Sequence, residues 1–223
     1  MDTYQHIRVA PAPKQDALAL TFRPARKSDA EVCAPLVFAS GVREFGFFLG
    51  ESSEVCIAFL RFAFASDGGR FSWRRHRVAV AADGAVVGVM AAHDGRSILL
   101  DDPHVAMMLL RFFGARRTVS MLLRGLVLES ELPAPKRAQT LIAHCATHET
   151  VRGTGVFSAL FDDALRAGVP GMATDREIVL DVLLSNTRAR ELYRRLGFVE
   201  LPRPRERSRK LPQELASVRM RLE

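Results

Sequence analysis

Two apolar runs, joined by a glycine turn and a helical pattern, limit the folds open to this 223-residue chain. The runs at 138–149 and 176–186 are typical of buried strands. Between them a helix is predicted at 153–168, starting at the glycine pair of VRGTGVFSAL (151–160). A strand, a helix and a second strand in this order form a crossover that makes the two strands parallel neighbours. The pattern therefore predicts a mixed α/β protein.

Further strands and helices are predicted on both sides of this unit. In order they are a strand at 18–25, helices at 27–41 and 52–66, a hairpin at 75–95, a helical segment at 102–128, and, after the crossover, a helix at 186–197 and strands at 198–201 and 216–223. The hairpin is expected to turn at Asp83-Gly84, and Gly114 to divide the segment 102–128. Residues 42–51 are interpreted as an apolar connection broken by glycine.

Composition narrows the class of protein. With 48% hydrophobic and 26% charged residues, the chain has the make-up of a globular protein with one sizeable core. The three cysteines lie far apart, which argues against a disulfide framework and for a reducing, cytoplasmic setting. No metal site is expected, because His144 and His148 have no clustered third ligand. We expect no secretory signal, and no transmembrane segment because arginines interrupt the most apolar stretch.

The net charge of +7 is compatible with three kinds of partner: nucleic acid, an anionic membrane, or a polyanionic cofactor. The chain lacks helix-turn-helix, zinc-finger and RNA-recognition signatures, so nucleic acid is not expected. The glycine turn favours the cofactor. The first N–H groups of a helix have no partner inside it, the helix start is partly positive, and glycine lets a phosphate approach. The alternative is a turn that merely connects two elements.

The segment 141–198 resembles the GNAT superfamily of acyl-CoA-dependent N-acyltransferases. The family's pyrophosphate loop has the pattern Arg/Gln-x-x-Gly-x-Gly/Ala, and residues 152–156 (RGTGV) fit its first five positions. Further on, the family has a strand, then Asn-x-x-Ala and Leu-Tyr-x-x-Leu-Gly-Phe. The stretch VLDVLLSNTRARELYRRLGF matches this at Asn186, Ala189, Leu192, Tyr193, Leu196, Gly197 and Phe198. The sixth loop position is Phe157, which either crowds the pyrophosphate or points into the core.

The resemblance implies an α/β (α+β) fold with a mixed, mostly antiparallel central sheet. The fourth and fifth strands of this sheet splay apart, and helices flank it. One such domain is expected at 18–223, after a flexible arm at 1–17 and with a helical insertion at about 94–139. Four roles are open for that insertion: it covers the pocket, forms a homodimer face, touches a membrane surface or packs as part of the core.

The resemblance also implies acetyl-CoA as the acyl donor, with its pantetheine arm between the splayed strands and its pyrophosphate on the glycine turn. The residues assigned to coenzyme A in this way are Cys145, Ala146, Thr147, Arg152, Gly153, Thr154, Gly155, Val156, Phe157 and Asn186. By the same resemblance Tyr193 protonates the leaving sulfur as general acid.

An alkyl amine with a pKa near 10.4 is only about 0.1% neutral at pH 7, so a base is expected to assist. His148 or Glu149 is the predicted base, and His144 and Glu131 are further candidates.

The implied activity is transfer of an acetyl group to a primary amine of a small molecule or peptide by direct attack. The acceptor is expected to bind between residues 41–54 and the basic loop 202–210. A non-catalytic acyl-CoA sensor is the alternative function.

Overall fold

The computed structural model describes residues 19–96, 98–168, 172, 176–202 and 209–223. The arm predicted at 1–17 and most of the basic loop predicted at 202–210 therefore lie outside the described residues. Within the described ranges, no single helix is long and apolar enough to cross a membrane. One helix pair, Lys27–Ser40 with Val42–Leu49, has sufficient length and apolar character but is bent by 95°.

The described strands form one seven-stranded sheet in the order β1-β2-β3-β4-β5-β7-β6. Every neighbouring pair is antiparallel except β4 and β5, which are parallel. The prediction of a mixed, mostly antiparallel sheet is thus confirmed. The strands are β1 (Leu20–Pro24), β2 (His76–Ala81), β3 (Val86–Asp94), β4 (Gln139–Thr147), β5 (Glu177–Leu183), β6 (Phe198–Glu200) and β7 (Ser217–Leu222).

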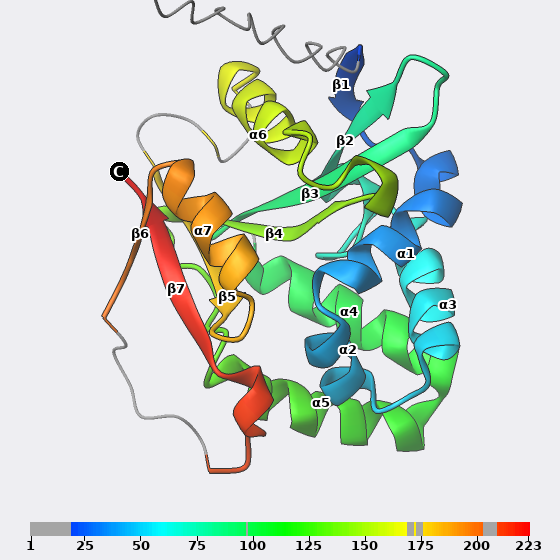
Figure 1. Cartoon of the computed structure of the whole chain (residues 1–223). Coiled ribbons are helices and arrows are strands. Elements are labelled where there is room, and N and C mark those ends of the chain that lie inside the picture. Colours follow the sequence, from blue (N-terminus) through cyan, green and yellow to red (C-terminus); the bar gives the residue numbers. More distant parts are fainter. Residues whose placement is uncertain (1–18, 97, 169–171, 173–175, 203–208) are drawn as a thin grey trace, which may run out of the picture.

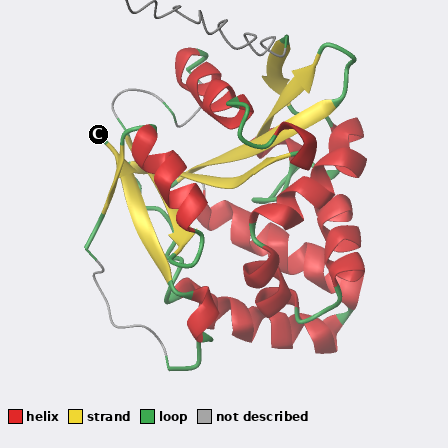
Figure 2. Ribbon diagram, in the orientation of Figure 1, coloured by secondary structure: helices red, strands yellow, loops and turns green. Residues whose placement is uncertain are grey.

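Helices pack on both faces of this sheet and bury two apolar clusters (Figures 1 and 2). The first cluster lies mainly among α1, α2, α3, α4 and α5, and the second beneath α6 and α7. The helices are α1 (Ala30–Ser40), α2 (Val42–Leu49), α3 (Ser53–Phe64), α4 (Ile98–Phe113), α5 (Ala115–Glu129), α6 (Val156–Arg166) and α7 (Thr187–Arg195), with short 3₁₀ turns η1 (Lys27–Asp29), η2 (Trp73–Arg75), η3 (Glu149–Val151) and η4 (Gln213–Leu215).

The turn residues do what their chemistry predicts. Gly84 has a φ of 87° in the β2–β3 hairpin, and the Asp83 carboxylate accepts a hydrogen bond from the Ala85 N–H at 2.9 Å. Gly114, with a φ of 76°, separates α4 from α5, as the sequence predicts. Gly197, with a φ of 92°, follows the end of α7. These glycines adopt backbone conformations that side chains with a Cβ rarely tolerate.

Two sequence predictions need correction. Residues 42–49, predicted to be a glycine-broken connection, form α2. Phe45 and Leu49 are buried one helical turn apart, and this packing offsets the low helix propensity of Gly46. In addition, α4 begins at Ile98, earlier than the predicted start at 102, because Pro103 does not end the helix.

The parallel strands β4 and β5 separate partway along their length. Pairing is limited to Gln139–Ile142 of β4, which lie beside Glu177–Leu180 of β5. β4 continues on β3 as far as Thr147, while β5 continues on β7 as far as Leu183. The edge of β4 from 143 to 147 therefore has no β5 partner. The predicted splay is confirmed, and it leaves room for an extended ligand to pair with that edge.

A β-bulge lies on the splayed part of β4. Val89 is opposite Ala146 and Ala91 is opposite Ala143, so two residues of β4, His144 and Cys145, face a single residue of β3. His144 has a φ of 54°, the only positive value at a non-glycine residue in the described chain. The bulge therefore changes the direction of the side chains at the point where the strands part.

Candidate functional site

The glycine turn after β4 forms an open helix start. Gly153 and Gly155 have φ values of 84° and 89°, and Gly155 caps α6. The first hydrogen bond inside α6 is donated by the Ala159 N–H to the Gly155 carbonyl at 3.0 Å. The N–H groups of the preceding three residues, 156–158, thus have no partner within the helix and are available to an anion.

Two arginines flank this turn. Arg152, predicted from the sequence, is exposed beside the glycines. Arg188, on the first turn of α7, is also exposed, and a Cβ placed on Gly153 would lie 3.2 Å from its Nη2. The sequence argument missed Arg188, although it lies inside the matched stretch NTRARELY. In the sequence, the only hint of Arg188 is a positive charge two residues after Asn186. That this side chain reaches the glycine turn becomes visible only in the fold. The turn therefore combines helix N–H groups with two guanidinium groups, as a phosphate site requires.

Phe157 points into the core rather than into the turn. Its side chain is buried, and its ring lies 6.4 Å from Phe161 and 6.0 Å, edge to face, from Tyr193. The sequence left two orientations open for this ring, towards the pyrophosphate or into the core, and in the structure it points into the core. Only the backbone N–H of Phe157 remains at the helix start, and its ring helps to hold Tyr193.

Tyr193 reaches from α7 to the bulge of β4. Its ring is buried between Phe157 and Phe198, whose ring centroid is 5.9 Å away. The phenol is hydrogen bonded to the Cys145 thiol, which in turn donates to the Ala143 carbonyl at 3.6 Å. Burial, followed by this contact with Cys145, raises the pKa of Tyr193 well above its ordinary value of 10. At neutral pH Tyr193 is therefore a protonated donor aimed at a sulfur atom.

Cys145 is the matching group on the strand. Burial raises the pKa of its thiol to about 12, and the hydrogen bond from Tyr193 opposes that shift. The residue is uncharged at neutral pH and lies where the splayed edge of β4 begins. Ala146 and Thr147 follow it on the same unpaired edge, opposite Val89 and Gly88 of β3.

The other predicted residues lie around this contact. Asn186 is exposed and caps α7, with its side-chain oxygen accepting from the Ala189 N–H at 3.1 Å. The Thr154 hydroxyl donates to the Val151 carbonyl at 2.8 Å and braces the glycine turn. His148, which caps η3, and Glu149, the first residue of η3, are exposed just before that turn. Within the described residues, no hydrogen bond joins either of them to Cys145 or Tyr193.

The remaining base candidates differ in setting. Glu131 is buried, and its carboxylate accepts from the Ser217 N–H at 2.6 Å, so it ties the segment after α5 to β7. His144 is half-buried in the bulge, and its ring lies 6.1 Å from the Phe45 ring of α2. It therefore faces the first apolar cluster, whereas Cys145 faces the second cluster and Tyr193.

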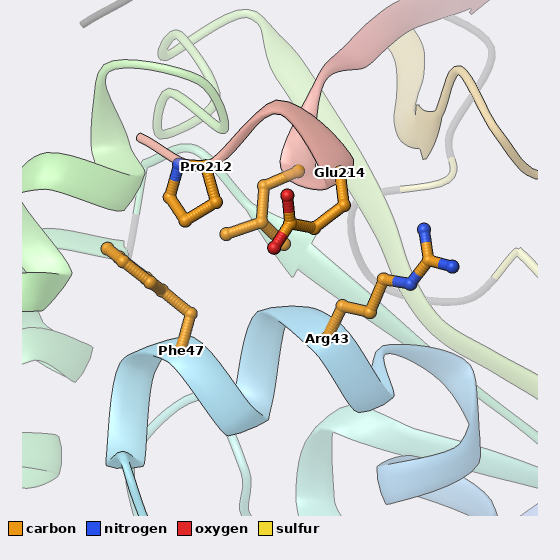
Figure 3. Close-up of a pocket in the computed structure, with 5 residues that line it drawn as sticks. Arg43, Phe47, Pro212 and Glu214 are labelled. Atoms are coloured by element: carbon orange, nitrogen blue, oxygen red, sulfur yellow. The ribbon is translucent and has the colours of Figure 1, made fainter. Parts of the chain in front are cut away.

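A hollow of about 320 Å³ lies between α2 and η4 (Figure 3). Arg43 and Phe47 rise from α2, and Pro212 and Glu214 face them from the chain before β7. Arg43 also donates to the Ser185 hydroxyl at 3.1 Å, so the hollow borders the end of β5. In Figure 1 this region lies near the bottom, and α6 near the top. The wall on α2 comes from the segment predicted for the acceptor at 41–54. The second wall, at 212–215, lies just beyond the predicted loop 202–210, of which residues 203–208 are outside the described residues.

A carboxylate on α2, the helix that forms one wall of the hollow, has an unusual environment. Glu44 is half-buried, its Oε2 is buried without a hydrogen-bond partner, and burial raises its pKa. A partly desolvated carboxylate of this kind can hold an ammonium group.

Comparison with known proteins identifies the family. The model of the acetyltransferase (GNAT) family matches residues 23–198. An N-acetyltransferase from Staphylococcus aureus Mu50 is 14% identical, with a TM-score of 0.65 over 91% of this chain and 100% of that one. A crystal structure described simply as an acetyltransferase is 19% identical, with a TM-score of 0.62 over 91% and 98%. A protein from Corynebacterium glutamicum ATCC 13032, described as histone acetyltransferase HPA2 and related acetyltransferase, is 23% identical, with a TM-score of 0.55 over 91% and 94%.

At these identities the solved structures establish a common fold, and no sequence among curated proteins matches significantly. The family model covers most of the chain, including both motifs around the Cys145–Tyr193 contact. The chain belongs to the GNAT family of acetyltransferases.

Proposed function

We propose that this protein transfers an acetyl group from acetyl-CoA to a primary amine of a small molecule or peptide by direct attack. The observation that carries the proposal is the contact between Tyr193 and Cys145. It holds a protonated phenol against the strand edge where β4 and β5 part, next to a helix start suited to phosphate. An acid donor, an extended slot and an anion site are the three features that a thioester of coenzyme A needs.

The residues of this chain divide the binding of the donor among them. The N–H groups at the start of α6, with Arg152 and Arg188, suit the pyrophosphate. The unpaired edge at Cys145, Ala146 and Thr147 suits the amide groups of the pantetheine arm. Coenzyme A, when bound, supplies the activated acetyl group. A backbone N–H of the splayed edge is the expected donor to the carbonyl oxygen of that group, where negative charge develops.

The transfer forms one C–N bond and breaks one C–S bond. The lone pair of the neutral amine attacks the thioester carbon, and the electron pair of the C–S bond leaves with sulfur. Tyr193 donates its phenolic proton to that sulfur, and a base accepts one proton from the amine nitrogen. The proton on the base returns to Tyr193 through solvent, so the protein ends unchanged. The raised pKa of Tyr193 does not forbid the step, because burial raises the proton affinity of the leaving thiolate as well.

The hollow between α2 and η4 is the proposed entry for the acceptor. Phe47 and Pro212 offer apolar contacts, whereas Glu214 offers a negative group to an ammonium and Arg43 a positive one to a carboxylate. The base predicted from the sequence for this step is His148 or Glu149.

An amine panel tests the function. We would incubate the protein with acetyl-CoA and, in turn, tyramine, lysine, spermidine and a peptide with a free N-terminus, and follow release of the CoA thiol and the mass of the product. We expect amine-dependent thiol release that matches the amount of acetylated amine. The N,N-dimethyl form of the accepted amine is the matched control, because it cannot form a neutral amide. Tight acetyl-CoA binding without turnover on any amine would instead favour the sensor function.

A further inference from the structure

Three histidines meet on the face of the sheet that carries α1 and α2. His76 of β2 and His144 of β4 have nearly coplanar rings, with centroids 5.1 Å apart, and His93 of β3 stands edge-on to His144 at 5.5 Å. His76 and His93 are buried, whereas His144 is only half-buried. In the described part of the chain no three such side chains are placed to hold a metal ion. The cluster therefore calls for another explanation.

The hydrogen bonds define the protonation of the pair. His76 Nδ1 lies 2.8 Å from the Ser72 carbonyl, and a carbonyl only accepts, so this nitrogen carries the proton. Burial lowers the pKa of His76 to about 4, so its Nε2 keeps a lone pair at neutral pH. His144 Nδ1 lies 2.9 Å from that Nε2 and must donate to it. The second nitrogen of His144, Nε2, is then an unprotonated acceptor.

The ring of His144 lies beside α2, the helix that forms one wall of the hollow. Within the described residues Nε2 of His144 has no hydrogen-bond partner, and it is not among the fully buried polar atoms, unlike Nδ1 of His93. The bulge turns His144 towards Phe45 of α2 and its neighbour Cys145 towards Tyr193. Two successive residues thus place a base and the partner of an acid on opposite sides of the splayed edge.

The charges around the pair keep it neutral. Burial, then His76, His93 and Arg70 lower the pKa of His144 well below its ordinary value. Arg70 and Arg75, the arginines near the cluster, form ion pairs with Asp102 and Asp101. The lone pair of His144 is therefore available throughout the neutral range.

We propose that His144 accepts the proton of the acceptor amine and that His76 is the positioning residue that fixes its tautomer. The inference rests on the proposed function. As the C–N bond forms, the amine nitrogen gives one proton to His144 Nε2, which becomes imidazolium. This ring shares its Nδ1 proton with His76 Nε2, so the positive charge spreads over two rings. A nitrogen bonded to the tetrahedral carbon is far more acidic than a free ammonium, so a weakly basic histidine suffices.

The tautomers are tested without any acceptor. Nitrogen-15 spectra of the histidine-labelled protein should show His76 and His144 protonated at Nδ1 and bare at Nε2, unchanged from about pH 6 to pH 8. Replacement of His76 by Leu should alter the His144 signals. An Nε2-protonated or titrating His144 would overturn the assignment whether or not the protein is an acetyltransferase.

Kinetics with the amine selected by the panel test the proton transfer. His144→Asn is the chosen variant, because asparagine tolerates the left-handed backbone at this position. It should lower kcat by about 10²- to 10⁴-fold with unchanged affinity for acetyl-CoA. His76→Leu should lower kcat and keep the KM for the amine, and His76→Gln should restore part of the loss, because its side-chain oxygen can accept from His144.

Matched variants separate the alternatives. His104→Asn, at an exposed histidine of α4, should keep the wild-type kcat. Wild-type kcat in His144→Asn, with the loss appearing in His148→Asn or Glu149→Gln, would overturn the relay and leave the function standing. If the wild type acetylates no amine, the function itself fails and the relay with it.

Discussion

Tyr193→Phe is the sharpest test of the acid at the splayed strands. The substitution removes the phenolic oxygen and keeps the ring, so the contacts with Phe157 and Phe198 remain. The lost hydrogen bond to the Cys145 thiol is worth about 1 kcal/mol. For a domain of this size that lowers Tm by about 2–4 °C, and the variant stays folded.

The effect on turnover should be much larger. Loss of a positioned general acid lowers kcat by about 10²- to 10⁴-fold, or about 3–5 kcal/mol of barrier at 1.36 kcal/mol per tenfold change. We would measure kcat by thiol release, acetyl-CoA affinity by calorimetry and Tm by scanning calorimetry. Because the pKa of Tyr193 is raised, its acid form persists to high pH, so the wild type should show no loss of kcat from Tyr193 ionisation below about pH 10. An unchanged kcat, or an affinity that falls as far as kcat, would refute the role of Tyr193 as acid.

Three further predictions concern the supports of the site. Phe157→Ala should lower the free energy of unfolding by about 3–5 kcal/mol, measured by denaturant titration, because it leaves a cavity beside Tyr193; a near-neutral effect would show that the ring is not core. Gly155→Ala should lower the free energy of unfolding by about 1–2 kcal/mol. The cost comes from the φ of 89° alone, because no atom lies within 4 Å of the added Cβ, and wild-type stability would contradict that backbone conformation. Stability should also fall as pH drops from about 6.5 to about 4. In this range His76 binds a proton in the unfolded chain, whereas its lowered pKa keeps it neutral in the folded chain. This term is on the order of 3 kcal/mol, and a His76→Gln variant with the same acid sensitivity as the wild type would contradict it.

Element order and the two motifs were predictable from the sequence. Strand alternation, helical spacing and turn glycines are local signals, and they place the β4–α6–β5 crossover, the hairpin and the break at Gly114 correctly. The register of NTRARELYRRLGF fixes Tyr193 on the inner face of α7, because residues one helical turn apart share a face. The core orientation of Phe157 follows from the same periodicity once α6 is known to start at Val156.

The features missed depend on contacts between distant residues. The bulge at His144 arises from the count of residues on β3 and β4 together, which neither strand reveals alone. The pairing of His144 with His76 joins positions 68 residues apart. Arg188 reaches Gly153 only because α7 packs beside the glycine turn. Helix α2 forms because tertiary burial of Phe45 and Leu49 outweighs the local cost of Gly46.

Calorimetric titration with acetyl-CoA, on the wild type, Arg152→Glu and Arg116→Glu, tests the donor site most directly. The two variants make the same change of charge, but Arg116 lies exposed on α5, away from the glycine turn. We expect one-to-one binding to the wild type and to Arg116→Glu, and at least about tenfold weaker binding to Arg152→Glu, since a charged hydrogen bond to phosphate is lost. Equal weakening in both variants would mean only a general effect of charge. A folded wild type that binds no acetyl-CoA would contradict the assignment of the glycine turn and the splayed strands as the donor site.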